Sequence, residues 1–244
     1  MAIGPERKYM TAAQASVADI DVGLRQYMLR VYNYMAGGVA LTGVVAYAFH
    51  LVLAGNPDLF QLIYGTPLKY VVIFAPLLFS LFFSARINTM SAATAQTLFW
   101  VFASVMGLSL ASIFLAFTTQ SLATTFFITA GMFAGVSLYG YTTKRDISSW
   151  GSFLFMGAWG IILALIVNVF LQSNALGFAV SVIGVFVFAG LTAYYNQQIK
   201  EMYLESDVGE VMAKKAIIGA YVLYISFINL FIMLLRLFGV VRSN

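Results

Sequence analysis

The chain alternates between long apolar stretches and short polar connections. Seven stretches approach or exceed the length of about 20 apolar residues that a membrane-crossing helix needs. They lie near residues 31–54, 68–85, 92–117, 121–141, 151–171, 175–195 and 216–238. A single span must satisfy its own backbone hydrogen bonds, and the alternating ten-residue pattern of a membrane barrel does not occur in the sequence. The pattern therefore predicts an all-α membrane protein, a bundle of seven transmembrane helices.

The beginning of the chain differs from the rest because it is polar and carries charges of both signs. The connections between the later stretches are short, and no low-complexity linker separates them. We therefore expect two parts, a polar cytoplasmic N-terminal segment over residues 1–26 and one seven-helix transmembrane domain over residues 27–244.

Basic residues are distributed unevenly between the two sides that seven spans would create. With the N-terminus in the cytoplasm, ten basic residues are cytoplasmic: Arg7, Lys8, Arg25, Arg30, Arg86, Lys144, Arg145, Lys200, Lys214 and Lys215. Only Lys69, Arg236 and Arg242 lie on the far side. This bias predicts a cytoplasmic N-terminus and an external C-terminus. A seventh segment that re-enters the membrane from the cytoplasm, instead of crossing it, stays an open alternative.

Composition supports the membrane assignment and excludes several kinds of chemistry. The chain is 61% hydrophobic and 9% charged, with a mean hydropathy of +0.90, whereas soluble domains carry about 25% charged residues. It has no cysteine and one histidine, His50, which we interpret as an interfacial side chain. None of the nine acidic residues lies inside a predicted span, where ion pumps and aspartyl proteases keep theirs. We therefore expect no enzyme activity, no cofactor, no metal centre and no nucleic-acid partner.

Polar residues within the last span form a candidate site. Gly219, Ser226, Asn229, Met233 and Arg236 recur at helical spacing and share one stripe. The stripe either hydrogen-bonds to neighbouring helices, with the arginine reaching the interface, or lines a polar path through the bundle.

Further polar residues lie toward the ends of other spans. Tyr195 and Gln198 share a face near the cytoplasmic end of the sixth span. Asn168 and Gln172, one turn apart in the fifth span, form a secondary polar site. Arg86 ends the second span, and we expect its long side chain to reach the cytoplasmic headgroups.

Two pairs of small residues have the four-residue spacing that lets helix backbones approach closely. They are Gly107 with Ala111 in the third span and Gly131 with Gly135 in the fourth. We expect both pairs to pack against neighbouring helices.

The sequence resembles the bacterial branch of the Bax inhibitor-one family, also called the transmembrane Bax inhibitor motif family. The segments that carry the resemblance are "RQYMLRVYNYMAGGVALTGVVAY", "SLYGYTTKRDISSWGSFLFMG", "AGLTAYYNQQIKEMY" and "LYISFINLFIMLLRLFG". The resemblance runs from about residue 25 to residue 240. It implies a seven-helix bundle with the last helix central, located in the bacterial inner membrane. It also implies the family's activities, which are a pH-dependent calcium leak and, in some bacterial members, restraint of a membrane-bound ATP-dependent protease.

The chain departs from the family at two positions. The family's sixth helix usually ends Tyr-Asp-x-Gln-x-Ile, and its seventh usually reads Leu-Tyr-Leu-Asp-Phe-Ile-Asn-Leu-Phe. The two aspartates, which sense protons and calcium in the family, correspond here to Tyr195 and Ser226. An arginine that can pair with the first aspartate corresponds to Arg86. Tyrosine and serine do not titrate near neutral pH, and calcium prefers charged oxygen ligands, so we expect gating by pH or calcium to be lost.

These observations lead to two hypotheses. We expect a central polar cluster of Tyr195, Gln198, Ser226, Asn229 and Arg86. The leading hypothesis is a non-enzymatic membrane protein related to calcium-leak channels, with a degenerate sensor and calcium ions as its partner. The alternative is a non-conducting interaction protein that modulates a membrane-bound ATP-dependent protease or a stress response.

Overall fold

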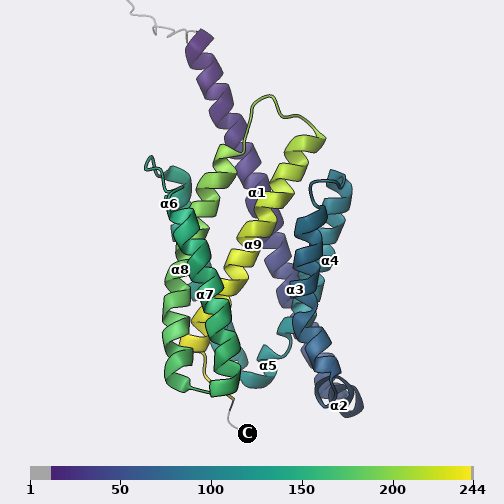
Figure 1. The fold of residues 1–244 in the computed structure, drawn as a ribbon. Helices are drawn as coiled ribbons and strands as arrows, with labels where there is room; N and C mark the ends of the chain where they lie inside the picture. Colours follow the sequence, from purple (N-terminus) through teal and green to yellow (C-terminus); the bar gives the residue numbers. More distant parts are fainter. Residues whose placement is uncertain (1–11, 243–244) are drawn as a thin grey trace, which may run out of the picture.

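The computed structural model describes residues 12–242, and the side chains of residues 22–242. This part of the chain folds into one helical bundle (Figure 1). Its helices are α1 (Ala12–Gly55), α2 (Pro57–Tyr64), α3 (Leu68–Arg86), α4 (Ala92–Leu110), α5 (Ile113–Ala116), α6 (Thr119–Thr142), α7 (Trp150–Leu171), α8 (Asn174–Glu201) and α9 (Glu210–Phe238). Seven segments are long and apolar enough to cross a membrane, with α4 and α5 counted as one span. The prediction of a seven-helix transmembrane bundle is confirmed.

The helices extend beyond several of the predicted stretches. The helix α1 begins at Ala12, ahead of the apolar stretch predicted from about residue 31, and it is continuous through the proposed boundary at residue 26. That boundary stays a prediction, and residues 1–11 lie outside the described chain. The sixth span continues to Glu201, and the seventh begins at Glu210. The ends of these helices are polar, so a pattern of apolar residues does not include them, although their backbones continue the helical hydrogen bonding.

Two local features were not predicted. The short helix α2 follows α1 directly and has Pro57 in its first turn, where the missing N–H has no helical partner to lose. The third span, expected over residues 92–117, is interrupted between α4 and α5. At the interruption, Ser112 Oγ donates a hydrogen bond to the carbonyl oxygen of Ser109 (3.0 Å). Such side-chain bonds compete with the helical backbone pattern.

The last helix, α9, is the centre of the bundle. In its most apolar 18-residue window 72% of the residues are buried, compared with 11% in the corresponding windows of α3 and α7. It runs obliquely through the middle of the molecule and packs against α1, α4, α6 and α8 (Figure 1). The helices α6, α7 and α8 lie on one side of it, and α3 and α4 on the other. The expectation that the last helix is central is confirmed.

Aromatic side chains join α9 to α4. Tyr224 is fully buried, and its ring packs edge-on against Phe99 (5.8 Å between centroids) and Phe102 (5.6 Å). Its hydroxyl lies 2.6 Å from the Thr42 hydroxyl of α1, which also donates to the Ala103 carbonyl oxygen (2.9 Å). One tyrosine therefore contributes apolar area to the core while its polar atom is satisfied.

The two small-residue pairs differ in what they contact. A Cβ added to Gly107 would lie 2.7 Å from Val45 Cβ on α1, so this glycine allows the close packing that the spacing predicts. The prediction is wrong for Gly131 and Gly135, because a Cβ at either position meets no atom of the described chain within 4 Å. The close contact of α6 is made instead by Gly140, where an added Cβ would overlap the Ala193 carbonyl oxygen of α8.

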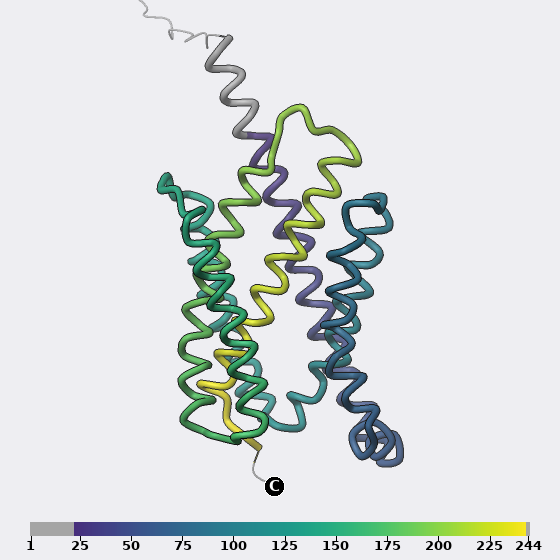
Figure 2. The backbone as a smooth tube through the Cα atoms, viewed as in Figure 1, coloured from purple at the N-terminus to yellow at the C-terminus, as the bar shows by residue number. Residues whose placement is uncertain are grey.

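The two ends of the bundle carry different charges. The N-terminal end, at which α1 enters the bundle, holds the connections at residues 87–91, 143–149 and 202–209. The C-terminal end holds α2, α5 and the residues after α9 (Figure 2). Among the described side chains, eight basic residues belong to the N-terminal end: Arg25, Arg30, Arg86, Lys144, Arg145, Lys200, Lys214 and Lys215. The C-terminal end has Lys69, Arg236 and Arg242.

The C-terminal end of the chain is attached to the turn between α5 and α6. Phe117 and Val241 form an isolated antiparallel β-bridge. Thr118 N donates to the carbonyl oxygen of Val240 (3.0 Å), and Arg242 N donates to that of Ala116 (2.9 Å). These bonds fix the end of α9 against a neighbouring connection.

Candidate functional site

Buried polar groups gather where α8 approaches the N-terminal end of the bundle, and Asn196 is their centre. This side chain is 0% exposed. Its Nδ2 donates to the Thr192 carbonyl oxygen one turn earlier (2.7 Å) and to Ser137 Oγ on α6 (3.2 Å). Its Oδ1 accepts from the Tyr32 hydroxyl of α1 (2.5 Å). One amide thus connects α1, α6 and α8, and all its partners are neutral groups.

The neighbouring residue Gln197 holds the connection between α6 and α7. Its Oε1 accepts from the backbone N–H of Ile147 (2.9 Å), and its Nε2 donates to the Arg145 carbonyl oxygen (2.9 Å). A side-chain amide presents a donor and an acceptor as a peptide group does, so it satisfies two backbone groups of the loop at once. Asp146, in the same loop, accepts from Ser148 N (2.8 Å), and this hydrogen bond lowers the pKa of the carboxyl below its usual range.

Gln198 and Tyr195 of α8 make contacts different from those of Asn196 and Gln197. Gln198 Nε2 donates to Ser148 Oγ (3.3 Å) and to a carboxylate oxygen of Glu201 (3.1 Å). The Tyr195 ring packs edge-on against Phe155 of α7, with 5.9 Å between the ring centroids. Both residues therefore contact α7 or the loop that precedes it.

The polar stripe predicted on α9 divides between two faces. Gly219 lies close to Ile199 of α8, and a Cβ at Gly184 of α8 would lie 2.7 Å from Met233 Sδ, so one part of the stripe faces α8. Ser226 is buried and donates to the Val222 carbonyl oxygen of its own helix (3.1 Å).

Asn229 faces a different side of the molecule. It lines a groove of about 460 Å³ between α3, α4 and α9, together with Ser80, Ser109 and Ser112. Its Nδ2 donates to the Ile225 carbonyl oxygen one turn earlier (2.9 Å). Asn229 is thus a polar group in a mostly apolar groove at the level of the membrane spans.

A family profile described as "Inhibitor of apoptosis-promoting Bax1" matches residues 24–243. The chain belongs to the Bax inhibitor family. Its relatives include the inner membrane protein YbhL of Escherichia coli K12, which is 44% identical over 227 residues, 92% of this chain and 95% of YbhL. A protein of Caulobacter vibrioides is 45% identical over 96% of both chains. The uncharacterized protein RP147 of Rickettsia prowazekii is 46% identical over 90% of this chain and 91% of its own.

The predicted central cluster of this Bax inhibitor family chain is spread over several contacts. Arg86 is exposed at the end of α3, and no ion pair within residues 22–242 includes it. In that part of the chain no hydrogen bond joins any two of the five predicted residues, which are Tyr195, Gln198, Ser226, Asn229 and Arg86. Tyr195 and Gln198 share α8, and Ser226 and Asn229 share α9.

The secondary polar site has a structural role at the end of α7. Gln172 has φ +49°, in the left-handed region, and its N–H donates to the Asn168 carbonyl oxygen (2.8 Å). Asn168 Oδ1 accepts from Ser173 N (3.0 Å). The two residues terminate the helix, as such caps commonly do.

Sequence reasoning did not find the residues that complete the Asn196 network. Tyr32 and Ser137 are 164 and 59 residues away from Asn196 along the chain. The signal available in the sequence was the polarity of Asn196 itself in an apolar helix, since a buried amide needs partners. Nothing local identifies which partners those are.

Proposed function

We propose that this chain is a multi-pass inner-membrane protein related to the family's calcium-leak channels, in which the switching of the leak by protons and calcium has been lost. The observation that carries the proposal is the Asn196 network. Where several helices converge, the interior is joined by an amide and two hydroxyls. Neither kind of group gains or loses a proton near neutral pH. Location in the inner membrane is favoured by the name of the relative YbhL.

The chemistry of the remaining spans agrees with this proposal. The positions that the family pattern assigns to sensing aspartates are occupied by Tyr195 and Ser226, which do not titrate usefully in this range. Within the described part of the chain no three His, Cys, Asp or Glu residues lie close enough to hold a metal ion. Calcium binds through several hard, mostly charged oxygens. We infer a role without enzymatic chemistry and without a calcium sensor in the spans.

Flux through reconstituted liposomes tests the proposal. We expect calcium flux of the purified protein to be absent or nearly flat between about pH 6 and pH 8, since none of the central groups titrates there. A steep change across this range would contradict the proposal. In that case His50 is the first residue to replace, because it is the chain's single histidine and its ring stacks on Phe114 (5.3 Å) at the C-terminal end of α1.

A second function is favoured by the ordered connections at the N-terminal end of the bundle. Glu210 accepts a hydrogen bond from Ala92 N (3.0 Å), and Lys214 Nζ donates to the Asn88 carbonyl oxygen (2.7 Å). Lys215 forms an ion pair with Asp207. With the loop held by Gln197, these contacts present a fixed surface, which suits docking of another protein. The candidate is a non-conducting modulator of a membrane-bound ATP-dependent protease.

Recovery of partners from native membranes tests this second function. Gln197→Ala removes the amide that holds the 143–149 loop. Binding of a protease would then have to order this loop, and the entropy cost should reduce its recovery several-fold. Gln120→Ala changes an exposed glutamine at the start of α6, at the opposite end of the bundle, and serves as the control. Equal recovery with both variants would count against the fixed surface, and absence of a protease from the wild-type sample would exclude this function.

A further inference from the structure

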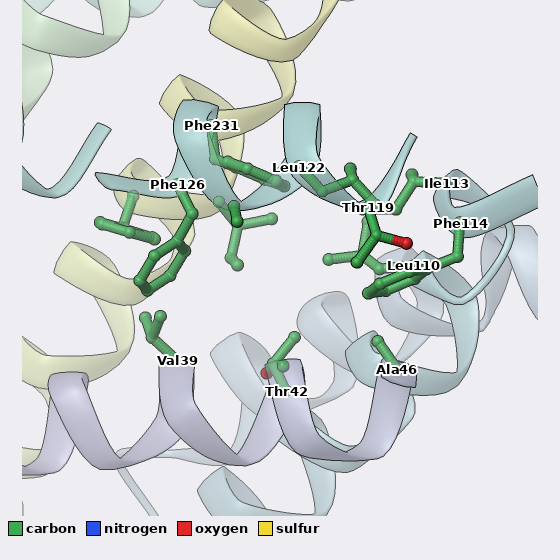
Figure 3. A pocket seen from close by; sticks show the side chains of 14 residues that line it. Val39, Thr42, Ala46, Leu110, Ile113, Phe114, Thr119, Leu122, Phe126 and Phe231 are labelled. Atoms are coloured by element: carbon green, nitrogen blue, oxygen red, sulfur yellow. The ribbon is translucent and has the colours of Figure 1, made fainter. Parts of the chain in front are cut away.

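A cavity of about 210 Å³ lies beside α9 in the C-terminal half of the bundle (Figure 3). Its walls come from α1, α4, α5 and α6, and its floor from α9. Residues that define it are Val39, Ala46, Leu122, Phe126, Phe227 and Phe231. We call it the α1–α6 cavity, because it lies between these two helices where both pack against α9.

The lining offers almost nothing to a polar ligand. Thr42 is one of two hydroxyl residues in the wall, and its hydroxyl is already engaged by the Ala103 carbonyl oxygen and by Tyr224. The remaining lining is aliphatic or aromatic apart from Thr119 and the backbone at Gly43. Apolar cavities of this kind stay dry, and one of roughly 150 Å³ is large enough to bind benzene. The ligand class is therefore a hydrocarbon.

The opening of the α1–α6 cavity faces sideways, between two membrane-crossing helices. Gly43 of α1 is exposed, and a Cβ added there meets no atom of the described residues within 4 Å. Ala123 and Phe126 are exposed across from it on α6. The outer surfaces around the opening carry the exposed apolar side chains of Val44 and Phe127. In a membrane-spanning bundle such a surface faces lipid, so the hydrocarbon next to the opening is that of the bilayer.

We propose that the α1–α6 cavity binds one acyl chain of a membrane lipid, inserted from the side between α1 and α6 against α9. Transfer from bilayer to cavity exchanges one apolar surrounding for another, so the affinity comes from close packing with the aromatic floor. The chain would fill the gap between α1 and α6 and complete the cover over α9. This inference does not depend on whether the protein conducts ions.

Quenching of tryptophan fluorescence by lipids with brominated acyl chains tests the proposal in nanodiscs. The native Trp100, Trp150 and Trp159 are replaced by phenylalanine, and one reporter is introduced by Phe231→Trp on the cavity floor. The control reporter is Phe188→Trp on α8, because Phe188 is 8% exposed, close to the 7% of Phe231, and does not line the cavity. We expect brominated chains to quench the cavity reporter by at least about twofold and the control little, since quenching needs near-contact distances.

Occupation is then blocked at the opening. Gly43→Phe places a ring at the opening, where an added Cβ meets no atom of the described chain within 4 Å, and should abolish the quenching of the reporter on the floor. Gly131→Phe is the matched control, because Gly131 is an equally unobstructed helical glycine outside the cavity. Equal quenching of the two reporters, or quenching that survives Gly43→Phe, would overturn the proposal.

Photo-crosslinking of the unaltered protein covers the case in which the reporter variants do not fold. A phospholipid with a diazirine on its acyl chain should label residues 39–46 and 122–126 in excess of the lipid-facing surface of α7, where Phe170 is 82% exposed. Uniform labelling of all exposed helices would indicate surrounding lipid only and would overturn the proposal.

Discussion

Asn196 is the residue on which the hydrogen bonds between α1, α6 and α8 converge. Asn196→Ala leaves the Tyr32 and Ser137 hydroxyls without this partner inside the bundle. We expect the free energy of unfolding to fall by about 2–3 kcal/mol, the upper part of the range for an unsatisfied buried polar group, because two hydroxyls lose their partner. Thermal unfolding in detergent measures the change. Ser226→Ala is the control, because Ser226 is also buried but bonds to its own helix, and its loss should be about 1 kcal/mol or less. Equal losses would show that Asn196 does not join the helices energetically.

The positions of the missing carboxylates allow a gain-of-function test. We expect Tyr195→Asp combined with Ser226→Asp to introduce pH-dependent calcium flux between about pH 6 and pH 8, since two nearby carboxylates cannot both ionise freely. Liposome flux across this range measures it. Removal of the Tyr195 ring, which packs on Phe155, also lowers stability by a few kcal/mol.

The control for this test is Tyr195→Ala with Ser226→Ala, which makes the same space without charge. If the alanine pair gains the same pH response, the response comes from the space and not from the carboxylates. A flat profile with the aspartate pair would mean that residues 195 and 226 are too far apart to share a proton.

At the scale of the helix, α6 provides two glycines whose surroundings are opposite. Gly140→Ala places a methyl group against the Ala193 backbone, and α6 and α8 can accommodate it only by moving apart. We expect a loss of stability of about 1–3 kcal/mol, typical of overpacking. The methyl group of Gly131→Ala meets no atom of the described part of the chain within 4 Å, so this change should be neutral or stabilising by up to about 1 kcal/mol through helix propensity. Unfolding temperatures of the two variants in the same detergent decide this, and a larger loss for Gly131→Ala would contradict the arrangement of α6.

The positions of the helices could be predicted from the sequence, but the contacts between them could not. Hydropathy predicts the spans because the bilayer imposes their length and composition, and it placed the start of the third span at residue 92, where α4 begins. The same signal cannot tell which face of α6 meets another helix, so the four-residue spacing of Gly131 and Gly135 was misleading while Gly140 went unnoticed. The interruption after Leu110, where Ser112 Oγ donates to the Ser109 carbonyl oxygen, leaves no signal in the hydropathy of the chain.

At the scale of the whole molecule, the uneven distribution of basic residues predicts the orientation of the bundle in the membrane. More of the described basic side chains lie at the N-terminal end of the bundle than at the other end, and the positive-inside tendency predicts that this end faces the cytoplasm. The helix α9 has 29 residues, about 43 Å at 1.5 Å per residue, which exceeds a hydrocarbon core of about 30 Å. We therefore expect a reporter that is active only in the periplasm to be active when fused after Asn244.

A matched fusion in the connection 143–149 provides the opposite expectation. There a reporter that is active only in the cytoplasm should work. If the fusion after Asn244 is active only with the cytoplasmic reporter, α9 does not carry the C-terminus across and the number of crossings is even.

The central position of α9 also has a consequence for biogenesis. The ribosome makes α9 after the helices that pack against it, which are α1, α4, α6 and α8. At roughly 5–20 residues per second the 29 residues of α9 take on the order of seconds to emerge. During that interval the earlier spans can be in the bilayer with their inward faces uncovered, and lipid is the material available to cover them. Maturation of the bundle is then an exchange of lipid for protein along one axis, completed when residues 239–242 attach to the α5–α6 turn.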